Sequence, residues 1–420
     1  SKRDKVDNDV IKFDERLNVL YLALKGEMLK FIPAKNGDKL TWLGVNEAFS
    51  KDEISNEFKS VLGAYIENLS LCVKSGECAG ADRSLEQISN YQRSTLGSLA
   101  PSEAKVSLEV LYNQMEIFEF LIYFYMILAL ASLALGFYRL FFGRKFRFER
   151  ALSLAFFTAF IVHALNLALR AYISGHAPWS DAYESLVYIS LISVLAGVLF
   201  FKHQSFALGA ASLFASVSLL VAHLNFINPQ ITNLVPVLKS FWLSVHVSVI
   251  TASYGFLGFG FVLGLVGLIL MALKNDKNEQ KLSEQIRYLA ATDELSLIIG
   301  LSLLTIGNFL GGVWANESWG RYWGWDSKES WSYITIIVYA IVLHLRFIPK
   351  LRGVFAFLTA SVLSFASVLF TYFGVNFYLS GLHSYANGES FGVSGLIYLI
   401  LAALALLIAL AYRGRDIKVV

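Results

Sequence analysis

Residues 240–273 read SFWLSVHVSVITASYGFLGFGFVLGLVGLILMAL and contain no Asp, Glu, Lys or Arg. A run of this kind is typical of a membrane-spanning helix, because a bilayer core of ~30 Å takes about 20 helical residues. The run is longer than a straight crossing requires, so we expect it to tilt, to kink or to extend into water.

The rest of the chain continues this pattern. Of its 420 residues, 56% are hydrophobic and 16% are charged, whereas a soluble domain has roughly 45–50% and about 25%. Apolar stretches occur at approximately residues 117–142, 151–173, 183–201, 205–226, 240–273, 293–314, 331–347, 353–378 and 393–412. We therefore predict an all-α polytopic membrane protein with about nine transmembrane helices.

Residues 1–116 differ from this region, since they hold 33 of the chain's 67 charged residues. We predict a small mixed α/β soluble segment there, a transmembrane domain at 117–412 and a short tail at 413–420. The net charge of +3 is too small to suggest a nucleic-acid binder. Cys72 and Cys78 form no CxxC or zinc pattern, so they make at most one disulfide.

Three local patterns predict elements within the soluble segment. Asn36-Gly37 lies between two short apolar runs, which predicts a hairpin within residues 29–43. Residues 50–53 read Ser-Lys-Asp-Glu and have the spacing of a capping box at a helix start. A further helix is predicted to begin near residues 101–102 and to continue into the membrane through Tyr112 and Phe118.

The Lys and Arg residues of the connections predict the orientation of the helices. One set of alternate connections carries 16 of them and the other set carries four. The larger set comprises Arg139, Arg144, Lys145, Arg147, Arg150, Lys202, Lys274, Lys277, Lys281, Arg287, Arg346, Lys350, Arg352, Arg413, Arg415 and Lys418, and the smaller set comprises Arg170, Lys239, Arg321 and Lys328. Because cytoplasmic connections are enriched in Lys and Arg, we expect the C-terminus in the cytoplasm and residues 1–116 outside.

Four loops are then expected on the outer side, at residues 174–185, 225–240, 313–331 and 376–390. The third loop reads VWANESWGRYWGWDSKESW. Its aromatic residues are Trp314, Trp319, Tyr322, Trp323, Trp325 and Trp331, interleaved with Arg321, Asp326, Lys328 and Glu329. One or two Trp residues would be ordinary at a membrane interface. Five of the chain's eight Trp within 18 residues predict a surface on which a large planar ligand stacks.

Four of the seven histidines lie at or near the outer side, namely His176, His223, His246 and His383. Any single one of them is ordinarily a hydrogen-bonded polar residue. Haem iron, however, takes imidazole as an axial ligand, so two histidines that flank the Trp-rich loop are suited to hold haem over it. These patterns do not choose which two of the four.

The other three histidines lie elsewhere. His344 is thirteen residues into the seventh stretch, ~20 Å along a helix at about 1.5 Å per residue. An ionisable residue at such a depth is a functional candidate, although a neutral His turned towards Arg346 fits equally well. His163, in the second stretch, is a weaker candidate, and His203 is expected to be solvated in a cytoplasmic loop.

Several familiar motifs are absent from the sequence. It has no P-loop, GxSxG or HExxH pattern, and the absence of CxxCH argues against a c-type cytochrome. Two rival classes are a transporter or channel without covalent chemistry and a membrane cytochrome b. The first should show inverted repeats and broken spans, which we do not find. The second needs paired histidines at matched depths, and only His163 and His344 lie deep.

Residues 319–331, WGRYWGWDSKESW, closely resemble the tryptophan-rich WWD signature of the haem-handling proteins of cytochrome c biogenesis. The Lys-Glu continuation is similar to that of the system II cytochrome c synthases, of the CcsA type or the fused CcsBA type. Residues 175–178 and 183–185 resemble an outer loop of the same family. Ser327 stands where the family usually has Pro, which we expect to loosen one turn. The resemblance covers roughly residues 110–412.

The resemblance implies roles for the histidines. His246 and His383 match the two external histidines that ligate haem iron. His344 matches a membrane-embedded histidine that holds haem in transit. The family's second membrane histidine belongs to its N-terminal partner half, and His163 is at best a weak substitute for it.

The resemblance also implies roles within the Trp-rich loop. The residues expected to bind haem are Trp314, Trp319, Arg321, Tyr322, Trp323, Trp325, Asp326, Lys328 and Trp331. Arg321 or Lys328 is expected to meet haem propionates. Asp326 and Glu329 are expected to organise the loop, and Asp326 is counted with the two external histidines as catalytic.

The implied function is that of a holocytochrome c synthase, a lyase that exports haem b and attaches it to CxxCH motifs of apocytochrome c. The closest alternative is a haem-delivery protein or transporter without covalent chemistry. Expected partners are apocytochrome c, haem, the N-terminal partner half, the lipid bilayer and thiol-reducing proteins. The expected location is a bacterial inner membrane, with residues 1–116 and the Trp-rich loop in the periplasm. The chain begins at Ser1 rather than Met, so we expect it to be part of a longer polypeptide. By the resemblance, residues 1–116 look like the end of the partner half's external domain, which favours a fused protein seen from its middle onward over a separate partner half.

Overall fold

The computed structural model describes residues 5–37, 39–143, 149–200, 205–224, 227–234, 239–379 and 395–417. The chain divides into two compact units, residues 1–107 and residues 108–420.

The first unit is a small helical domain with one hairpin. It contains α1 (Lys5–Leu24), β1 (Ile32–Asn36), β2 (Lys39–Leu43), α2 (Val45–Ser50), α3 (Asn56–Ser75), α4 (Ala79–Leu96) and the turn η1 (Gly97–Leu99). The strands pair antiparallel with Ile32 opposite Leu43, and Gly37 turns the chain at φ 59°, which confirms the predicted hairpin. Phe58 of α3 stacks on Tyr91 of α4 beside the hairpin, with 3.7 Å between the ring centroids.

The helix start predicted at residues 50–53 is wrong. Ser50 ends α2, and the backbone of Lys51 is extended. The next helix is instead capped by Ser55, whose hydroxyl accepts the N–H of Phe58 at 3.2 Å. A capping box marks a helix only where a buried face follows, and here the buried face of α3 begins with Phe58 and Leu62.

Cys72 and Cys78 form a disulfide. It joins the end of α3 to the residue that precedes α4. The bond therefore closes the short connection between these two packed helices.

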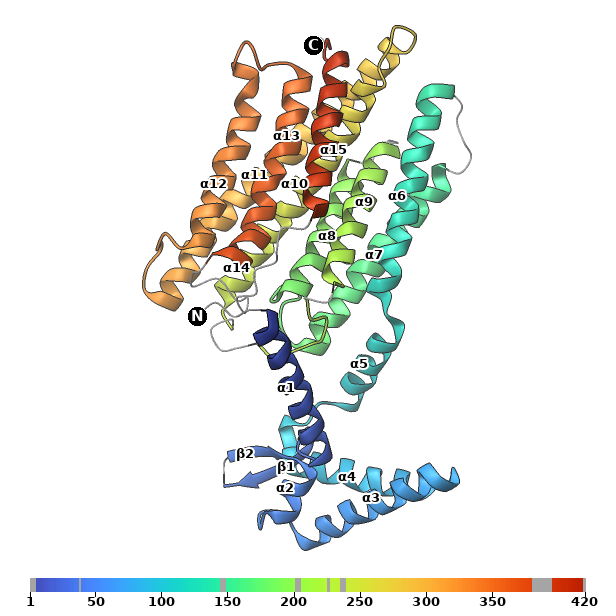
Figure 1. Cartoon of the computed structure of the whole chain (residues 1–420), viewed down its shortest axis with the longest axis vertical. Coiled ribbons are helices and arrows are strands. Elements are labelled where there is room, and N and C mark those ends of the chain that lie inside the picture. Colours follow the sequence, from blue (N-terminus) through green and yellow to red (C-terminus); the bar gives the residue numbers. More distant parts are fainter. Residues whose placement is uncertain are drawn as a thin grey trace. The chain divides into compact units, whose positions relative to one another are not determined.

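The second unit is a helical bundle (Figure 1). After α5 (Glu103–Met115) it comprises α6 (Ile117–Phe142), α7 (Glu149–Ser174), α8 (Ala182–Leu199), α9 (Ser205–Ala222), α10 (Phe241–Ala272), α11 (Glu279–Trp319), α12 (Ser327–His344), η3 (Leu345–Phe347), α13 (Val354–Leu369), the π-helical turn η4 (Phe370–Gly374), α14 (Val375–Tyr378), α15 (Gly395–Ala411) and η5 (Tyr412–Gly414). Among the described residues, nine helices are long and apolar enough to cross a membrane, which confirms the predicted fold class.

The helix predicted to run from residues 101–102 through Phe118 is divided in two. Glu116 takes φ 44° and separates α5 from α6. A left-handed residue of this kind ends an α-helix, because it breaks the repeating backbone geometry.

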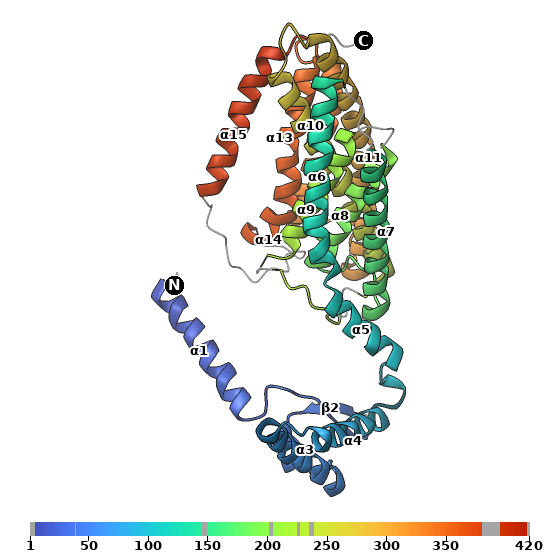
Figure 2. The ribbon, with the colours of Figure 1, turned by 90° about the vertical axis from the view of Figure 1, so that its right-hand side faces the viewer.

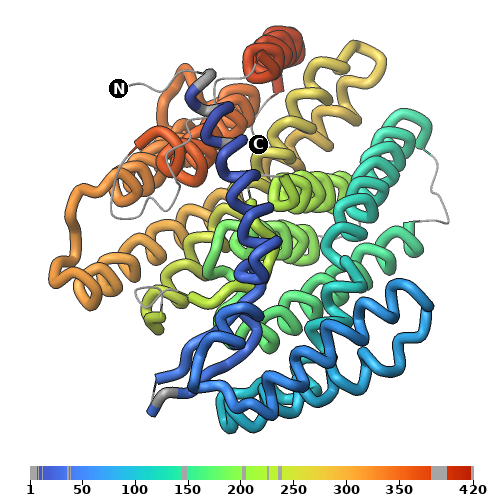
Figure 3. The backbone as a smooth tube through the Cα atoms, turned by 60° about the horizontal axis from the view of Figure 1, so that its bottom comes forward, coloured from blue at the N-terminus to red at the C-terminus, as the bar shows by residue number. Residues whose placement is uncertain are grey.

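Helix α10 lies at the centre of the bundle. It contacts α8, α9, α11, α13 and α15, and 78% of its most apolar 18-residue stretch is buried (Figure 3). A Cβ at Gly258 would lie 2.0 Å from the Phe214 ring, so glycine is what allows α9 and α10 to approach. Helix α15 stands at the edge instead, and 6% of its most apolar 18-residue stretch is buried (Figure 2).

The Trp-rich segment connects α11 to α12 at one end of the bundle. The end of α7 and the beginnings of α8 and α10 belong to the same end, as does the end of α13 with η4 and α14. We refer to it as the Trp end.

Candidate functional site

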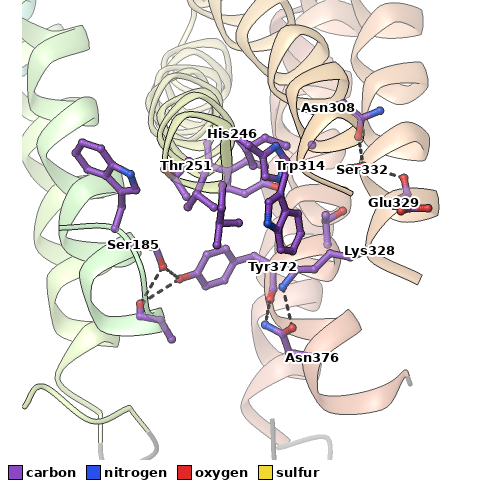
Figure 4. Close-up of a pocket in the computed structure, with 18 of the residues that line it drawn as sticks. Ser185, His246, Thr251, Asn308, Trp314, Lys328, Glu329, Ser332, Tyr372 and Asn376 are labelled. Atoms are coloured by element: carbon purple, nitrogen blue, oxygen red, sulfur yellow. Dashed lines mark hydrogen bonds between the residues drawn. The ribbon is translucent and has the colours of Figure 1, made fainter. Parts of the chain in front are cut away.

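A cavity of about 860 Å³ lies at the Trp end, between α8, α10, α11, α12 and the segment after α13 (Figure 4). Its volume falls in the range of about 300–1,000 Å³ that is usual for small-molecule sites. Most of its wall is apolar, with a limited set of polar side chains. Such a wall is suited to a large ligand with a few polar groups.

The Trp-rich segment is mostly helical. Helix α11 continues to Trp319 and α12 begins at Ser327, so only residues 320–326 of the expected loop 313–331 are irregular. Gly320 ends α11 at φ 71°, the left-handed conformation that commonly terminates helices. Asp326 caps α12, and its carboxylate accepts the N–H of Lys328 at 2.8 Å.

Glu329 closes the turn between the two helices. Its Oε2 accepts the N–H of Gly324 at 2.8 Å and the N–H of Asp326 at 3.1 Å. Trp325, between these two residues, is held at φ 54°, which is rare for a residue other than glycine. Among the residues described, those lining the cavity include Glu329 but not Asp326. The side chain of Asp326 thus acts on the backbone as a helix cap.

The five tryptophans of the segment occupy different environments. Trp314 and Trp323 line the cavity. Trp319 packs edge-on against Trp314 with 4.8 Å between centroids, and Trp331 packs against a phenylalanine of η4 at 4.1 Å. Trp325 is 73% exposed. Two of the five therefore form the aromatic wall, and each is packed against another, Trp314 against Trp319 and Trp323 against the exposed Trp325 at 5.7 Å.

Two further residues of the segment lie at its surface. Tyr322 lines the cavity while 65% of it remains exposed. Arg321 is exposed, and its guanidinium packs over Gly324, where a Cβ would lie 2.7 Å from Cζ. Arg321 is not among the lining residues described, whereas Lys328 is.

His246 lines the cavity from α10. Its Nδ1 lies 2.7 Å from the carbonyl oxygen of Gly307 on α11. A carbonyl only accepts, so Nδ1 carries the hydrogen and Nε2 carries the lone pair. The ring is held against Gly311, where a Cβ would lie 2.6 Å from Cε1, and it lies nearly parallel to Trp314. A ligating histidine is usually fixed by such a hydrogen bond on its other nitrogen.

The remaining outer histidines are arranged differently. His176 makes hydrogen bonds to the carbonyls of Ala177 and Thr232, at 3.1 and 3.3 Å. His223 pairs with the Tyr183 hydroxyl at 3.3 Å and borders a smaller cavity of about 200 Å³. His383 lies outside the described residues, as does His203.

The two histidines expected at depth also differ from each other. His163 is fully buried, with Nε2 donating to the Val187 carbonyl at 3.2 Å and Nδ1 facing the Tyr125 hydroxyl at 3.3 Å. Both of its nitrogens are satisfied by protein groups. His344 is the last residue of α12, at the end opposite the Trp end. Its side chain is exposed at the surface of the bundle.

A polar wall of the same cavity is formed by Ser185, Lys328, Tyr372 and Asn376. The Lys328 ammonium donates to Oδ1 of Asn376 at 2.8 Å. The Tyr372 hydroxyl lies 2.6 Å from the Ser185 hydroxyl and donates to the Ala182 carbonyl at 3.2 Å. The π-helical turn η4 contains Tyr372 and directly precedes α14, which carries Asn376. Such turns are frequent at functional sites, because they change the direction of side chains in a helix.

The connection between α7 and α8 is held in place by a buried ion pair. Arg170 and Glu184 are both fully buried, with 2.9 Å between Nε and Oε1. Arg170 also donates to the Tyr112 hydroxyl at 3.2 Å and to the carbonyls of Pro229 and Gln230, at 2.9 and 3.3 Å. One guanidinium thus joins α5, α7, α8 and the segment before α10.

This connection supplies part of the cavity wall. Trp179 donates from Nε1 to the Ser244 carbonyl at 2.8 Å, and Asp181 caps α8. Burial, together with the charge of Glu184, raises the pKa of Asp181 to about 6. Both residues line the cavity.

The sequence patterns did not identify the polar wall. Ser185, Tyr372 and Asn376 had no assigned role at the ligand site, although Ser185 lies in a motif that resembles the family's outer loop. The usable signal was the spacing of Tyr372 and Asn376, four residues apart in an otherwise apolar stretch.

Comparisons with known proteins identify the chain's relatives. Residues 179–383 match the family model described as cytochrome C assembly protein. The chain is 46% identical over 391 residues to protein NrfI of Wolinella succinogenes, covering 93% of this chain and 43% of NrfI. It is 35% identical over 260 residues to cytochrome c biogenesis protein CcsA of Prochlorococcus marinus subsp. pastoris, covering 56% of this chain and 82% of that protein.

The helices and these matches define a multi-pass membrane protein of cytochrome c assembly. The chain belongs to the CcsA-type family of cytochrome c biogenesis proteins, as its Trp-rich motif predicted. It spans 43% of the length of NrfI.

Proposed function

We propose that this chain binds haem in the cavity at the Trp end and attaches it covalently to CxxCH segments of apocytochrome c. The observation that carries the proposal is the His246 imidazole in an aromatic cavity of about 860 Å³, whose Nδ1–H donates to the Gly307 carbonyl, so that Nε2 is the nitrogen with the lone pair. Imidazole is a common axial ligand of haem iron, and the flat walls at Trp314 and Trp323 suit a porphyrin.

The second iron ligand in this proposal is His383, on the resemblance of its position to the family's second external histidine. His223 and His176 are less suited, because protein groups take up both nitrogens of each ring.

Lys328 is proposed to bind a haem propionate. Its ammonium lies in the cavity and donates to a neutral amide, that of Asn376. A half-buried cation of this kind gains a counter-charge when a carboxylate binds. Arg321 is proposed to bind a propionate only where the ligand reaches the rim of the cavity, because its side chain is exposed.

In the proposed reaction each CxxCH thiol adds its S–H bond across one haem vinyl group. Sulfur bonds to one vinyl carbon, the hydrogen goes to the other carbon, and no group leaves. The protein contributes proximity and orientation, which convert an encounter with a peptide into an effectively intramolecular addition. The histidine of the CxxCH segment then replaces one of the protein's iron ligands.

The proposed location is a bacterial inner membrane with the Trp end in the periplasm. The distribution of Lys and Arg supports this orientation. The Cys72–Cys78 disulfide supports it independently for the first unit, because disulfides persist in oxidising compartments. His344, at the opposite end of α12, is then proposed to hold haem in transit on the cytoplasmic side, together with the N-terminal partner half.

The absorption spectrum of the full-length protein in detergent, reduced minus oxidised, tests the haem site. We expect a bis-imidazole haem spectrum in the wild type that is lost or altered in His246→Ala and His383→Ala. His223→Ala is the matched control, because it removes an imidazole at the same end without touching the cavity. A wild type that lacks haem and fails to support cytochrome c maturation would contradict the proposal.

A second experiment separates covalent attachment from delivery. The haem-loaded protein is incubated with a reduced CxxCH peptide, and the products are separated under denaturing conditions. Haem that stays on the peptide demonstrates a synthase. Haem that leaves the protein without a thioether bond supports the delivery function instead.

A further inference from the structure

Among the described residues, helix α11 carries a buried carboxylic acid that has no basic partner, unlike Glu184 of α8. Asp293 is fully buried and faces α10. A Cβ at Gly260 would lie 2.6 Å from its Oδ1, and a Cβ at Gly264 would lie 3.6 Å from its Oδ2. These two glycines, one turn apart on α10, leave the space that the carboxyl occupies.

Polar groups from two other helices gather around this carboxyl. Helix α13 borders the same space, because a Cβ at Gly264 would also lie 2.8 Å from Val362. Ser361 of α13 is fully buried within hydrogen-bonding reach of the carboxyl, and Tyr339 of α12 is fully buried as well. In the described part of the chain no hydrogen bond of good distance and angle reaches the Asp293 carboxyl, although Ser361 is near enough to form one after a small movement. Buried polar atoms are otherwise nearly always paired, so a fully buried carboxyl in this state requires an explanation.

The charges nearby favour a neutral carboxyl. Glu294, the next residue on α11, forms an ion pair with Arg346 at 2.8 Å, and that pair is partly exposed. Among the ion pairs of the described residues, none includes Asp293. An ionised carboxylate there would be a buried charge without a counter-ion, next to a second carboxylate.

We propose that Asp293, Tyr339 and Ser361 form a proton-binding site inside the bundle, with Asp293 as the neutral acid. A protonated carboxyl offers one O–H donor and one carbonyl acceptor. A small side-chain rotation lets it donate to the Ser361 hydroxyl, and without a charge the carboxyl needs no counter-ion. A metal cation is a poorer occupant, because the site has one carboxylate and two hydroxyls while hard cations take about six oxygen ligands.

The proton exchanges from the end opposite the Trp end. Asp293 adjoins Glu294 in the sequence, and the Glu294–Arg346 pair lies at the exposed surface beside the end of α12. The cavity at the Trp end is lined by residues of α11 from Asn308 onward, several turns away. The site is therefore separate from the proposed haem cavity and does not depend on it.

Infrared spectroscopy of the full-length protein, labelled with carboxyl-¹³C aspartate, tests the proposal. The measurement is made at about pH 8, where ordinary aspartates are ionised, as is Asp181 with its pKa of about 6. We expect one protonated-carboxyl band that shifts with the label and in heavy water. Asp293→Asn should abolish this band, and Glu294→Gln, the adjacent carboxylate, should leave it in place.

A conservative variant covers the case in which Asp293→Asn does not accumulate. In Asp293→Glu the band should lose its sensitivity to labelled aspartate and follow labelled glutamate instead. The proposal is overturned if the wild type has no such band, if the band persists in Asp293→Asn, or if heavy water leaves it unshifted.

Discussion

The two connections that wall the cavity are built in opposite ways. The Trp-rich connection is organised within ten residues, by Gly320 at the end of α11, Asp326 at the start of α12 and Glu329 across the turn. The connection before α8 is organised over long distances, by an Arg170 guanidinium that reaches Tyr112 and Pro229, 58 and 59 residues away. One wall depends on local backbone chemistry, and the other depends on the assembled bundle.

This difference predicts where mutations act. A change in the Trp-rich turn should alter the shape of the site while the bundle stays folded. A change in the Arg170 network should destabilise the bundle itself, because it leaves buried charge without a partner.

Arg170→Ala is expected to have the largest effect. It leaves Glu184 as an unpaired buried carboxylate, which costs roughly 3–5 kcal/mol of unfolding free energy. Thermal unfolding of the detergent-purified protein measures the change. Arg139→Ala is the matched control, because its pair with Glu149 is 41% and 29% exposed and should contribute about 1 kcal/mol or less. Equal effects of the two variants would refute the importance of burial.

Glu329→Ala should cost less stability and affect the site more. It removes the acceptor of two backbone N–H groups, which amounts to about 2 kcal/mol, and releases the strained backbone of Trp325. We expect an altered haem spectrum in a protein that still folds. Glu317→Ala, which removes an exposed carboxylate bonded to Ser240, should leave that spectrum unchanged. A normal spectrum in Glu329→Ala would show that the turn does not shape the site.

Trp323→Ala should weaken haem binding about tenfold, equivalent to about 1.4 kcal/mol, because it removes part of the flat wall. Trp325→Ala is the comparison, since that side chain packs edge-on against Trp323 at 5.7 Å but is 73% exposed and is not among the described residues that line the cavity. We therefore expect a smaller loss from it. Titration of the haem-free protein with haem compares the two. A larger loss in Trp325→Ala would place the planar ligand outside the cavity.

The smallest expected effect is a pH dependence at Asp181. Its pKa rises from 3.8 to about 6 on folding, so between these values the folded state binds the proton more tightly than the unfolded chain. The free energy of unfolding therefore falls as pH rises through this window. We expect about 1 kcal/mol, because a side chain 33% exposed is partly screened by solvent. In Asp181→Asn the melting temperature should no longer depend on pH between these two values. If the pH dependence of the melting temperature is unchanged in this variant, another group causes it.

The same contrast explains what the sequence could predict. The nine apolar stretches follow from bilayer thickness, and the density of Trp at 314–331 marks one wall of the site without further information. The Arg170 network carries no local pattern. Arg170 counted only as one of four basic residues expected outside, and its partner Glu184 follows fourteen residues later across a turn.

The polar wall was missed for a related reason. Tyr372 and Asn376 meet Ser185 and Lys328 only after α8, α12 and α13 have packed. Their helix also contains the π-helical turn η4, which helical periodicity does not predict. The prediction at residues 50–53 was wrong for the opposite reason. There the local spacing of a capping box is present, but no helix with a buried face follows it.

The turn η4 also has a consequence for chain length. A π-helical turn holds about one residue more than an α-helical turn, and each residue of an α-helix rotates the next by about 100°. Deleting one residue from 370–374 would turn η4 into an ordinary α-helical turn and leave Asn376 pointing in nearly its present direction, because five π-helical residues and four α-helical residues rotate the chain by nearly the same angle. The residues within the turn, among them Tyr372, would change direction instead. A relative that lacks one residue can therefore keep the Asn376 position, and a one-residue gap in an alignment belongs within these five residues.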